Sequence, residues 1–368
     1  MQTTPMHPPA SPAPADWRLA QIDRARCALR EGLPAPASLP PWIERSWSRC
    51  LAQGLRPEAP VGFELVSAAA TRRARDASAG LLRAAAGPLA SLGRAVGRIG
   101  YFTLLTDAQG VVVGVDGAID RTDRRADVIA RVGVDLSERA VGTTAIGAAL
   151  AERQPVWLHR GEHFFDDTAC YTCAGAPVFG PHGDCVGMLD VTGVDAAERP
   201  GLRHLVTQAA RGIGNALVLG EPHALLLRVR WPGEAFGGDD DGLLALDADG
   251  RIAGANAAAR EMTGLAPHPG GEPPHAGEVF ALPWAQLFDA ARHPAPREVP
   301  LWSGLAVQVL AQAAGASVRE LAAPAAALRE VEAGLIRQAV REARGNVMEA
   351  ARRLGISRAT VYRRLRGD

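Results

Sequence analysis

The side chains best suited to chemistry lie close together in the chain, between positions 159 and 185. They are His159, His163, Cys170, Cys173, His182 and Cys185. Two cysteines separated by two residues can form a thiol switch, and thiolates together with histidines can hold a metal ion. A single CxxC is a weak zinc signal, however, and cysteine is also a common apolar residue in strands. The pattern supports a redox- or metal-sensing hypothesis for Cys170, Cys173 and Cys185, with a structural role as the alternative.

Other chemistry is restricted by composition. All forty basic residues are arginine, and lysine does not occur. A P-loop needs lysine for the nucleotide phosphates, and Schiff-base catalysis needs an amine. No Ser-His-Asp or paired-carboxylate arrangement stands in a suitable context. We therefore expect a protein that is not an enzyme, and the sequence indicates no particular cofactor.

The bulk properties predict a cytoplasmic protein. Forty basic residues balance forty acidic ones, so any affinity for nucleic acid must come from a local patch. No apolar run approaches the roughly 18 residues of a membrane span. The N-terminus lacks the layout of a signal peptide, and five cysteines do not suggest a disulfide framework. The Pro-rich residues 1–40 are predicted to be a disordered lead-in.

Residues 41–220 are predicted to form an α+β sensor-like domain. Two helical segments over about 40–100 precede a hairpin that turns at Asp107 to Gly110. A helix over 141–153 and a short strand follow, and then a second hairpin turns at Gly180 to Asp184. A final helix begins after Pro200. This order describes one antiparallel sheet packed by helices.

A second, smaller domain is predicted over 221–312. A strand and an Asp-Gly turn at Asp249 and Gly250 lead into another strand and a helix that ends near Leu265. The segment 299–312 then indicates a final pair of strands. Residues 313–326 form an Ala-rich linker to the C-terminal segment.

The C-terminal residues 327–368 are predicted to form an all-α helix-turn-helix. Val347, Ala350, Ala351 and Leu354 form one apolar stripe, and Gly355 supplies the left-handed backbone of a sharp turn. Ser357 is a natural N-cap for the second helix. Between positions 344 and 366, seven arginines stand against one acidic residue, which is the electrostatic footprint of a DNA-binding unit.

This segment resembles the Fis-type helix-turn-helix at the end of many bacterial transcription regulators. The resemblance rests on Ile336, Ala339, Gly345, Asn346, Ala350, Ala351, Leu354, Gly355, Ile356 and Leu365. It implies that double-stranded DNA is contacted by the second helix, and it places the DNA-binding residues at Asn346, Ser357, Arg358, Thr360, Arg363 and Arg364. The apolar face of a helix over 328–343 is expected to form a homodimer.

The N-terminal part of the chain resembles the N-terminal sensor region of AcoR-like regulators, which contains a GAF domain. The matching residues are Ser46, Trp47, Gly142, Thr143, Ala145, Ile146, Gly147, Glu162, His163, Phe164, Leu189 and Asp190. A weaker resemblance to a PAS domain rests on Asp247, Gly250, Ile252 and Asn256. Gly142, Thr143, Glu162 and His163 are candidates for a ligand pocket between sheet and helices, although small residues also permit tight packing.

Members of that family usually carry an ATPase domain that acts on polymerase holding sigma-54, between the sensor and the helix-turn-helix. About fifteen residues stand there in this chain, with no P-loop. The expected function is therefore a sequence-specific transcription regulator that senses a ligand or redox state and acts without ATP hydrolysis. The alternatives are a redox or metal sensor and a nucleoid-like architectural protein. The effector and the sign of regulation stay open.

Overall fold

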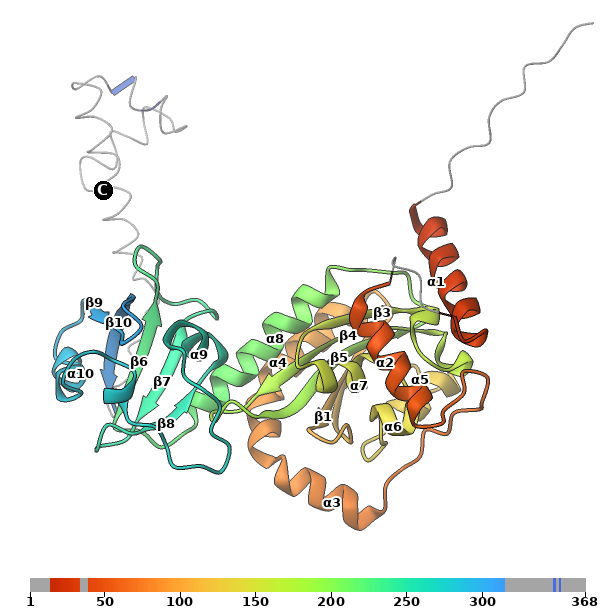
Figure 1. Ribbon diagram of the computed structural model, residues 1–368, viewed down its shortest axis with the longest axis horizontal. Coiled ribbons are helices and arrows are strands. Elements are labelled where there is room, and N and C mark those ends of the chain that lie inside the picture. Colours follow the sequence, from red (N-terminus) through yellow and green to blue (C-terminus); the bar gives the residue numbers. More distant parts are fainter. Residues whose placement is uncertain (1–13, 34–38, 315–346, 349–350, 352–368) are drawn as a thin grey trace, which may run out of the picture. The chain divides into compact units, whose positions relative to one another are not determined.

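The computed structural model describes residues 14–33, 39–314, 347–348 and 351. Two five-stranded antiparallel sheets lie within one compact unit that ends at Ala314 (Figure 1). The expected α+β fold class is confirmed. Most of the expected helix-turn-helix lies outside the described residues.

The first sheet has the strand order β2-β1-β5-β4-β3. Its strands are β1 (Tyr101–Asp107), β2 (Val112–Gly117), β3 (Val156–His159), β4 (Tyr171–Phe179) and β5 (Cys185–Val194). Both expected hairpins are present, because β1 pairs with β2 and β4 pairs with β5. In the first turn, the Asp107 side chain accepts from the N–H groups of Gln109 and Val111, both at 2.9 Å.

Helices cover both faces of the first sheet (Figure 1). On one face pack α4 (Ala79–Gly97) and α8 (Leu202–Leu219), whereas α5 (Arg124–Ile129), α6 (Glu138–Val141) and α7 (Ala145–Glu152) lie on the other. Because side chains alternate along a strand, Phe102 and Leu104 face the second group while Tyr101 and Leu105 face the first. All four are buried, so the domain has two cores separated by the sheet.

The second sheet has the order β8-β7-β6-β10-β9. Its elements are β6 (Leu225–Arg230), β7 (Gly242–Leu246), β8 (Ile252–Ala255), α9 (Ala257–Thr263), α10 (Ala285–Ala290), β9 (Arg297–Pro300) and β10 (Ala306–Ala313). Asn256 caps α9, since its Oδ1 accepts from the N–H of Ala259 at 2.8 Å. The strands and the helix expected from the sequence are all present. The C-terminal part of α8 meets this sheet, where Val218 packs with Leu243 and Ala245.

The N-terminal residues correct one prediction. Residues 1–40 were expected to be disordered, but residues Pro14–Arg30 form a helix, α1, which packs on the first domain. Ile22 and Ala25 are buried. Ile22 lies against Gly161, and a Cβ atom at Gly161 would lie 2.9 Å from the Ile22 side chain.

The helix α2 (Pro41–Ala52) follows with its own buried face, and α3 (Ala68–Ala77) precedes α4. No helix in the described ranges is long and apolar enough to cross a membrane.

The docking of α1 depends on Arg26, which is almost fully buried. Its Nη1 donates to the carbonyl oxygens of His163 at 2.7 Å and Phe164 at 2.5 Å, and its Nη2 pairs with Asp166. Arg30 pairs with the same carboxylate at 2.7 Å but is about half exposed. The two arginines therefore share a partner and differ in burial.

Replacing Arg26 by Met should release α1, because two buried carbonyl groups lose a charged donor at a cost of about 2 kcal/mol or more. Hydrogen exchange of the α1 amides should accelerate by roughly 30-fold, the equivalent of that energy. Arg30→Met is the matched control and should change exchange little, since exposed ion pairs contribute about 0–1 kcal/mol. Equal effects of the two substitutions would contradict the assigned role of burial.

Candidate functional site

A small, partly open cavity lies between the first sheet and the helices α5 and α7. The space in it that is open to water-sized molecules is about 30 Å³, which is room for one or two waters. The residues that line it are Phe63, Leu104, Ile129, Leu136, Thr144, Ala145, Ile146, His163, Thr168, Tyr171, Cys173, Asp190 and Thr192. Most of this wall is apolar, with a few polar groups, and this composition is typical of small-molecule sites although the cavity itself is small.

His163 supplies the first polar group of the cavity. It follows the short 3-10 helix η1 (Arg160–Glu162), and its side chain is buried. Its Nδ1 lies 2.9 Å from the carbonyl oxygen of Arg160, so Nδ1 carries the proton and donates. Burial lowers the pKa of His163 to about 4, which keeps the ring neutral. Nε2 is thus an acceptor, and it has no hydrogen-bond partner among the described residues.

Asp190 supplies the second polar group. Strand alternation places Met188, Asp190 and Thr192 on the face toward α7, while Leu189 and Val191 point into the other core. The Thr192 hydroxyl donates to Oδ2 of Asp190, and Oδ1 has no partner in the described part of the chain. Burial raises the pKa of Asp190 to about 7. The carboxyl group is therefore largely protonated below neutral pH.

Gly142 and Thr143 were predicted to be pocket residues, and the structure assigns them other contacts. Gly142 has φ +65°, and a Cβ there would lie 2.9 Å from Phe164, so the position needs glycine for packing. The Thr143 hydroxyl lies 2.8 Å from that of Ser46 on α2. Neither residue lines the cavity. The alternative of tight packing is the one that the structure supports.

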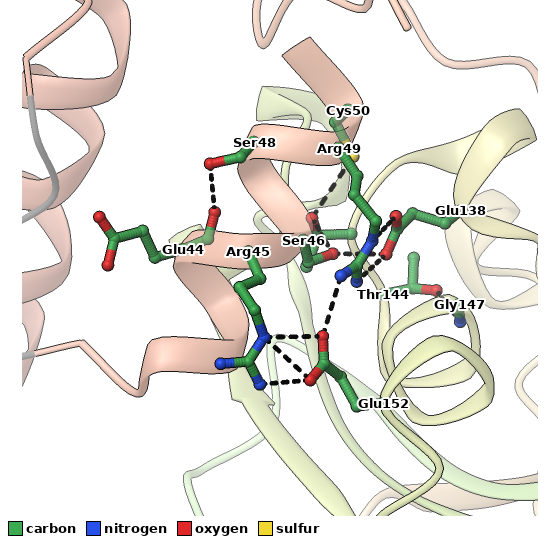
Figure 2. A network of polar contacts seen from close by, with 11 residues as sticks. Glu44, Arg45, Ser46, Ser48, Arg49, Cys50, Glu138, Thr144, Gly147 and Glu152 are labelled. Atoms are coloured by element: carbon green, nitrogen blue, oxygen red, sulfur yellow. Dashed lines mark hydrogen bonds and ion pairs between the residues drawn. The ribbon is translucent and has the colours of Figure 1, made fainter. Parts of the chain in front are cut away.

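These contacts belong to a polar network that docks α2 onto α6 and α7 (Figure 2). Ser46 donates to Glu138 at 2.6 Å, and Arg49 pairs with Glu138 at 2.7 Å and with Glu152 at 2.9 Å. Gly147 lets α7 lie close to the start of α6, because a Cβ atom at Gly147 would lie 2.8 Å from the backbone of Glu138. Since α7 contributes to the cavity wall, this network positions one side of the site.

Glu162 was also predicted to be a pocket residue, and it too faces away from the cavity. Its carboxylate is buried and accepts from Arg18 on α1 at 2.9 and 3.0 Å. Its carbonyl oxygen accepts from the indole N–H of Trp47 at 3.0 Å. Burial raises the pKa of Glu162 to about 7. Glu162 thus joins α1 and α2 to the segment that carries His163, the one predicted pocket residue that does line the cavity.

The predicted cysteine cluster is wrong in its geometry. Cys173 lies opposite Thr192 on β5, and its Sγ is 3.2 Å from the Thr192 hydroxyl. Cys185 lies opposite Phe179 at the other end of the same hairpin, roughly 20 Å away by the rise of a strand. Burial raises the thiol pKa of Cys170, Cys173 and Cys185, which disfavours the reactive thiolate. Over the described ranges, no three His, Cys, Asp or Glu side chains are placed to hold a metal ion.

Sequence reasoning missed most of the cavity wall. Asp190 was noted only as part of the family resemblance, and Thr192, Tyr171 and Thr168 were not noted. An aspartate in the apolar run CVGMLDVTG was the available signal, because a charged residue is rarely buried without a reason. The predicted DNA-binding residues Asn346, Ser357, Arg358, Thr360, Arg363 and Arg364 lie outside the described residues.

The raised pKa of Asp190 predicts how stability depends on pH. The unfolded pKa is near 3.8 and the folded one about 7, so the favourable contribution of the protonated group is complete below pH 4 and is lost as pH rises through 7. Asp190→Asn should therefore gain stability relative to the wild type between pH 4 and 8, by up to about 4 kcal/mol.

Chemical denaturation at several pH values measures this gain. Glu162 titrates in the same range but is present in both proteins, so its contribution cancels in the comparison. The control is Asp289→Asn at an exposed position, which should give a constant difference. A constant difference for Asp190→Asn as well would show that Asp190 is not a buried acid.

Comparison with known proteins gives two family matches. Residues 23–216 match the family described as "MimR, N-terminal domain", and residues 327–366 match "Bacterial regulatory protein, Fis family". The second match contains every predicted DNA-binding residue. It begins thirteen residues after Ala314, so an ATPase domain cannot stand between the second sheet and this segment.

Three curated relatives are similar to this chain. The acetoin catabolism regulatory protein of Cupriavidus necator is 33% identical over 259 residues, covering 67% of this chain and 37% of the relative. The acetoin dehydrogenase operon transcriptional activator AcoR of Bacillus subtilis is 26% identical, covering 50% and 30%. The propane 2-monooxygenase operon transcriptional activator MimR of Mycolicibacterium goodii is 27% identical, covering 49% and 30%.

The chain thus spans about a third of the length of these relatives. All three are named as regulators of transcription or catabolism, which agrees with the Fis-family segment. Because the first family match extends over more than half of the sequence, the chain belongs to the family of transcription regulators that share the MimR N-terminal domain.

Proposed function

We propose that this protein is a cytoplasmic, dimeric transcription regulator in which a small effector in the cavity changes how two helix-turn-helix units bind DNA. It does so without ATP hydrolysis and without catalysing a reaction. The observation that carries the proposal is a cavity lined by two buried polar residues, His163 and Asp190, each with an atom that has no hydrogen-bond partner among the described residues, in a chain that also holds a Fis-family segment.

The DNA-binding part of the proposal rests on the sequence of the tail. Seven arginines between positions 344 and 366 can neutralise phosphates, and the start of the second helix can reach base edges in the major groove. In this proposal Arg358 and Thr360 read bases, and Arg364 contacts the backbone. The apolar face over 328–343 pairs two copies, so that the operator has two half-sites.

The sensing part rests on the elements that surround the cavity. Asp190 lies on β5, and Leu189 next to it packs into the core that contains α8. The C-terminal part of α8 contacts the second sheet through Val218, and Asn215 of α8 accepts from Asn256 at 2.7 Å. A shift of β5 on ligand binding can therefore reach the second sheet through α8. The structure provides these contacts, and the proposal adds that they couple ligand binding in the cavity to the position of the second sheet.

The proposed mode of regulation is supported by the short distance between the second sheet and the Fis-family segment, which leaves no room for an ATPase domain there. The longer relatives have room for further domains, whereas this chain has no lysine for a P-loop and only a short linker before the Fis-family segment. The effector therefore acts through occupancy or spacing on DNA. Repression, activation by contact and mixed dimers with a longer relative are all compatible with this mechanism.

Two substitutions in the tail test the DNA-binding roles. Arg358→Ala should weaken binding to the preferred site by about 1–3 kcal/mol and relax specificity. Arg364→Ala should weaken binding to all sequences alike and lower the salt dependence by about one ion. Fluorescence anisotropy with specific and competitor DNA, over a range of salt, measures both effects. Equal, uniform losses from the two variants would instead support a nucleoid-like architectural protein.

A further inference from the structure

We propose that the outer surface of α3 and α4 is a second DNA-contacting face, which binds the phosphate backbone of the duplex held by the Fis-family segment. The proposal rests on the proposed function in one respect, namely that the chain binds DNA through that segment. It adds an interaction surface in the first domain. We call this surface the arginine face, and it consists of Arg72, Arg73, Arg75, Arg83, Arg94 and Arg98.

The arginine face concentrates positive charge in a chain whose net charge is zero. Residues 66–100 contain these six arginines and one acidic residue, Asp76. All six arginines are exposed. Among the described residues, none of the six forms an ion pair or a hydrogen bond through its side chain. Positive charge of this density, with no carboxylate to neutralise it, attracts a polyanion.

The arginines of α1 and α2 show a different pattern. Most of them pair with carboxylates of the first domain, namely Arg18, Arg26, Arg30, Arg45 and Arg49. Their charge is therefore neutralised within the protein. In the arginine face, Arg75 and Arg94 lie in the last turns of their helices, where a cation complements the helix dipole by about 0.3–1 kcal/mol. That structural role accounts for these two and leaves the other four unexplained.

Helical spacing directs the arginines of α4 to one side. Arg83 and Arg94 are eleven residues apart, which is about three turns, so both point away from the sheet and lie roughly 16 Å apart along the axis. Arg98 follows one turn later, at the end of the helix. Small residues stand between them, and a Cβ atom at Gly87 would meet nothing within 4 Å. The helix α3, with the other three arginines, has no buried residue and stands out from the domain (Figure 1).

The chemistry of this surface favours DNA over a membrane or a second copy of the chain. A helix that binds a membrane surface carries apolar residues that enter the lipid, but none of the exposed large apolar side chains in the described ranges lies on α3 or α4. A symmetric contact between two copies would bring the arginine face against itself, and repulsion between like charges opposes that. The carboxylate of Asp116 lies against Gly93, on the sheet side of α4, so it does not face the arginines.

Tethering gives these contacts their effect. The Fis-family segment belongs to the same chain, so its binding holds the arginine face near the duplex at a high effective concentration. Each arginine that meets a phosphate then releases a counterion. The arginine face therefore adds affinity and salt dependence without base readout, because phosphates carry no sequence information directly.

Removal of charge from α4 tests the proposal in the full chain. The α4 triple variant combines Arg83→Gln, Arg94→Gln and Arg98→Gln, all at exposed positions. Fluorescence anisotropy with a random-sequence duplex should give a slope of log affinity against log salt that is lower by about two to three, since each lost phosphate contact lowers it by about 0.9. A fourfold rise in salt should then weaken the variant about 10- to 40-fold less than the wild type.

A matched variant removes the same charge elsewhere. Arg24→Gln, Arg139→Gln and Arg297→Gln replace exposed arginines on α1, α6 and β9 that also lack an ion pair in the described part of the chain. This control should change the slope by less than about one. Circular dichroism checks that both variants fold. Equal slopes for the α4 triple variant and the control would overturn the proposal, because net charge alone would then explain the effect.

Chemical protection gives a second readout on the unaltered protein. Phenylglyoxal modifies exposed guanidinium groups, and mass spectrometry locates the modified residues. The random-sequence duplex should protect the arginine face from modification and leave Arg24 and Arg139 as reactive as in the free protein. Equal protection of all exposed arginines, or no protection of the arginine face, would contradict the proposal.

The remaining outcomes identify a different occupant or separate the proposal from the proposed function. A wild-type salt slope together with a changed sedimentation coefficient in the α4 triple variant would assign the surface to contacts between copies, and the proposal would fail. Loss of binding to phosphatidylserine vesicles with intact DNA binding would also overturn it. If the tail substitutions weakened DNA binding and the α4 triple variant did not, the proposed function would stand without the arginine face. If only the α4 triple variant lost affinity, the arginine face would stand and the proposed role of the tail would fail.

Discussion

Burial of both faces of the first sheet is the constraint on which the rest of this domain depends. Leu104 and Leu105 are neighbours that point in opposite directions, yet both are buried. A strand in such a sheet has no solvent side on which a polar residue can lie. Asp190 must therefore find its hydrogen bonds inside the protein, and it does so only in part. This incomplete pairing is what marks the cavity beside β5 as the candidate site.

The segment after β3 shows how the site is completed from outside. Residues 160–168 contain two short 3-10 helices and pair with no strand. Their carbonyl oxygens are satisfied instead by side chains from the N-terminal helices, namely Arg26 of α1 and Trp47 of α2. His163 is held in the cavity wall by these contacts. Residues far apart in the sequence thus cooperate in placing one imidazole ring.

Much of the fold could be predicted because its signals are local. The turn at Asp107 and the apolar runs on each side required no knowledge of distant residues, and the same is true of the Gly180 turn. The helix α1 was missed because its buried stripe is short and its other residues are charged and polar, so that burial of Ile22 and Ala25 is decided by the domain they contact. The cysteine cluster was mispredicted for the opposite reason. Proximity in sequence suggested proximity in space, but six residues of strand, Ala174 to Phe179, lie between Cys173 and the turn of the hairpin.

Local pattern was sufficient for the order of the strands, the absence of a P-loop and the basic tail with its Fis-family resemblance. It also located His163 and Asp190 among the residues shared with a family, although without their roles. The roles depend on desolvation and on partners contributed by α1, α2 and Thr192, which are properties of the assembled structure. From the sequence, Gly142 and Glu162 were predicted to contact a ligand, but in the folded protein Gly142 packs against Phe164 and Glu162 binds Arg18. The position of a side chain relative to a cavity is set by elements that lie far away in the sequence, so local pattern could not predict it.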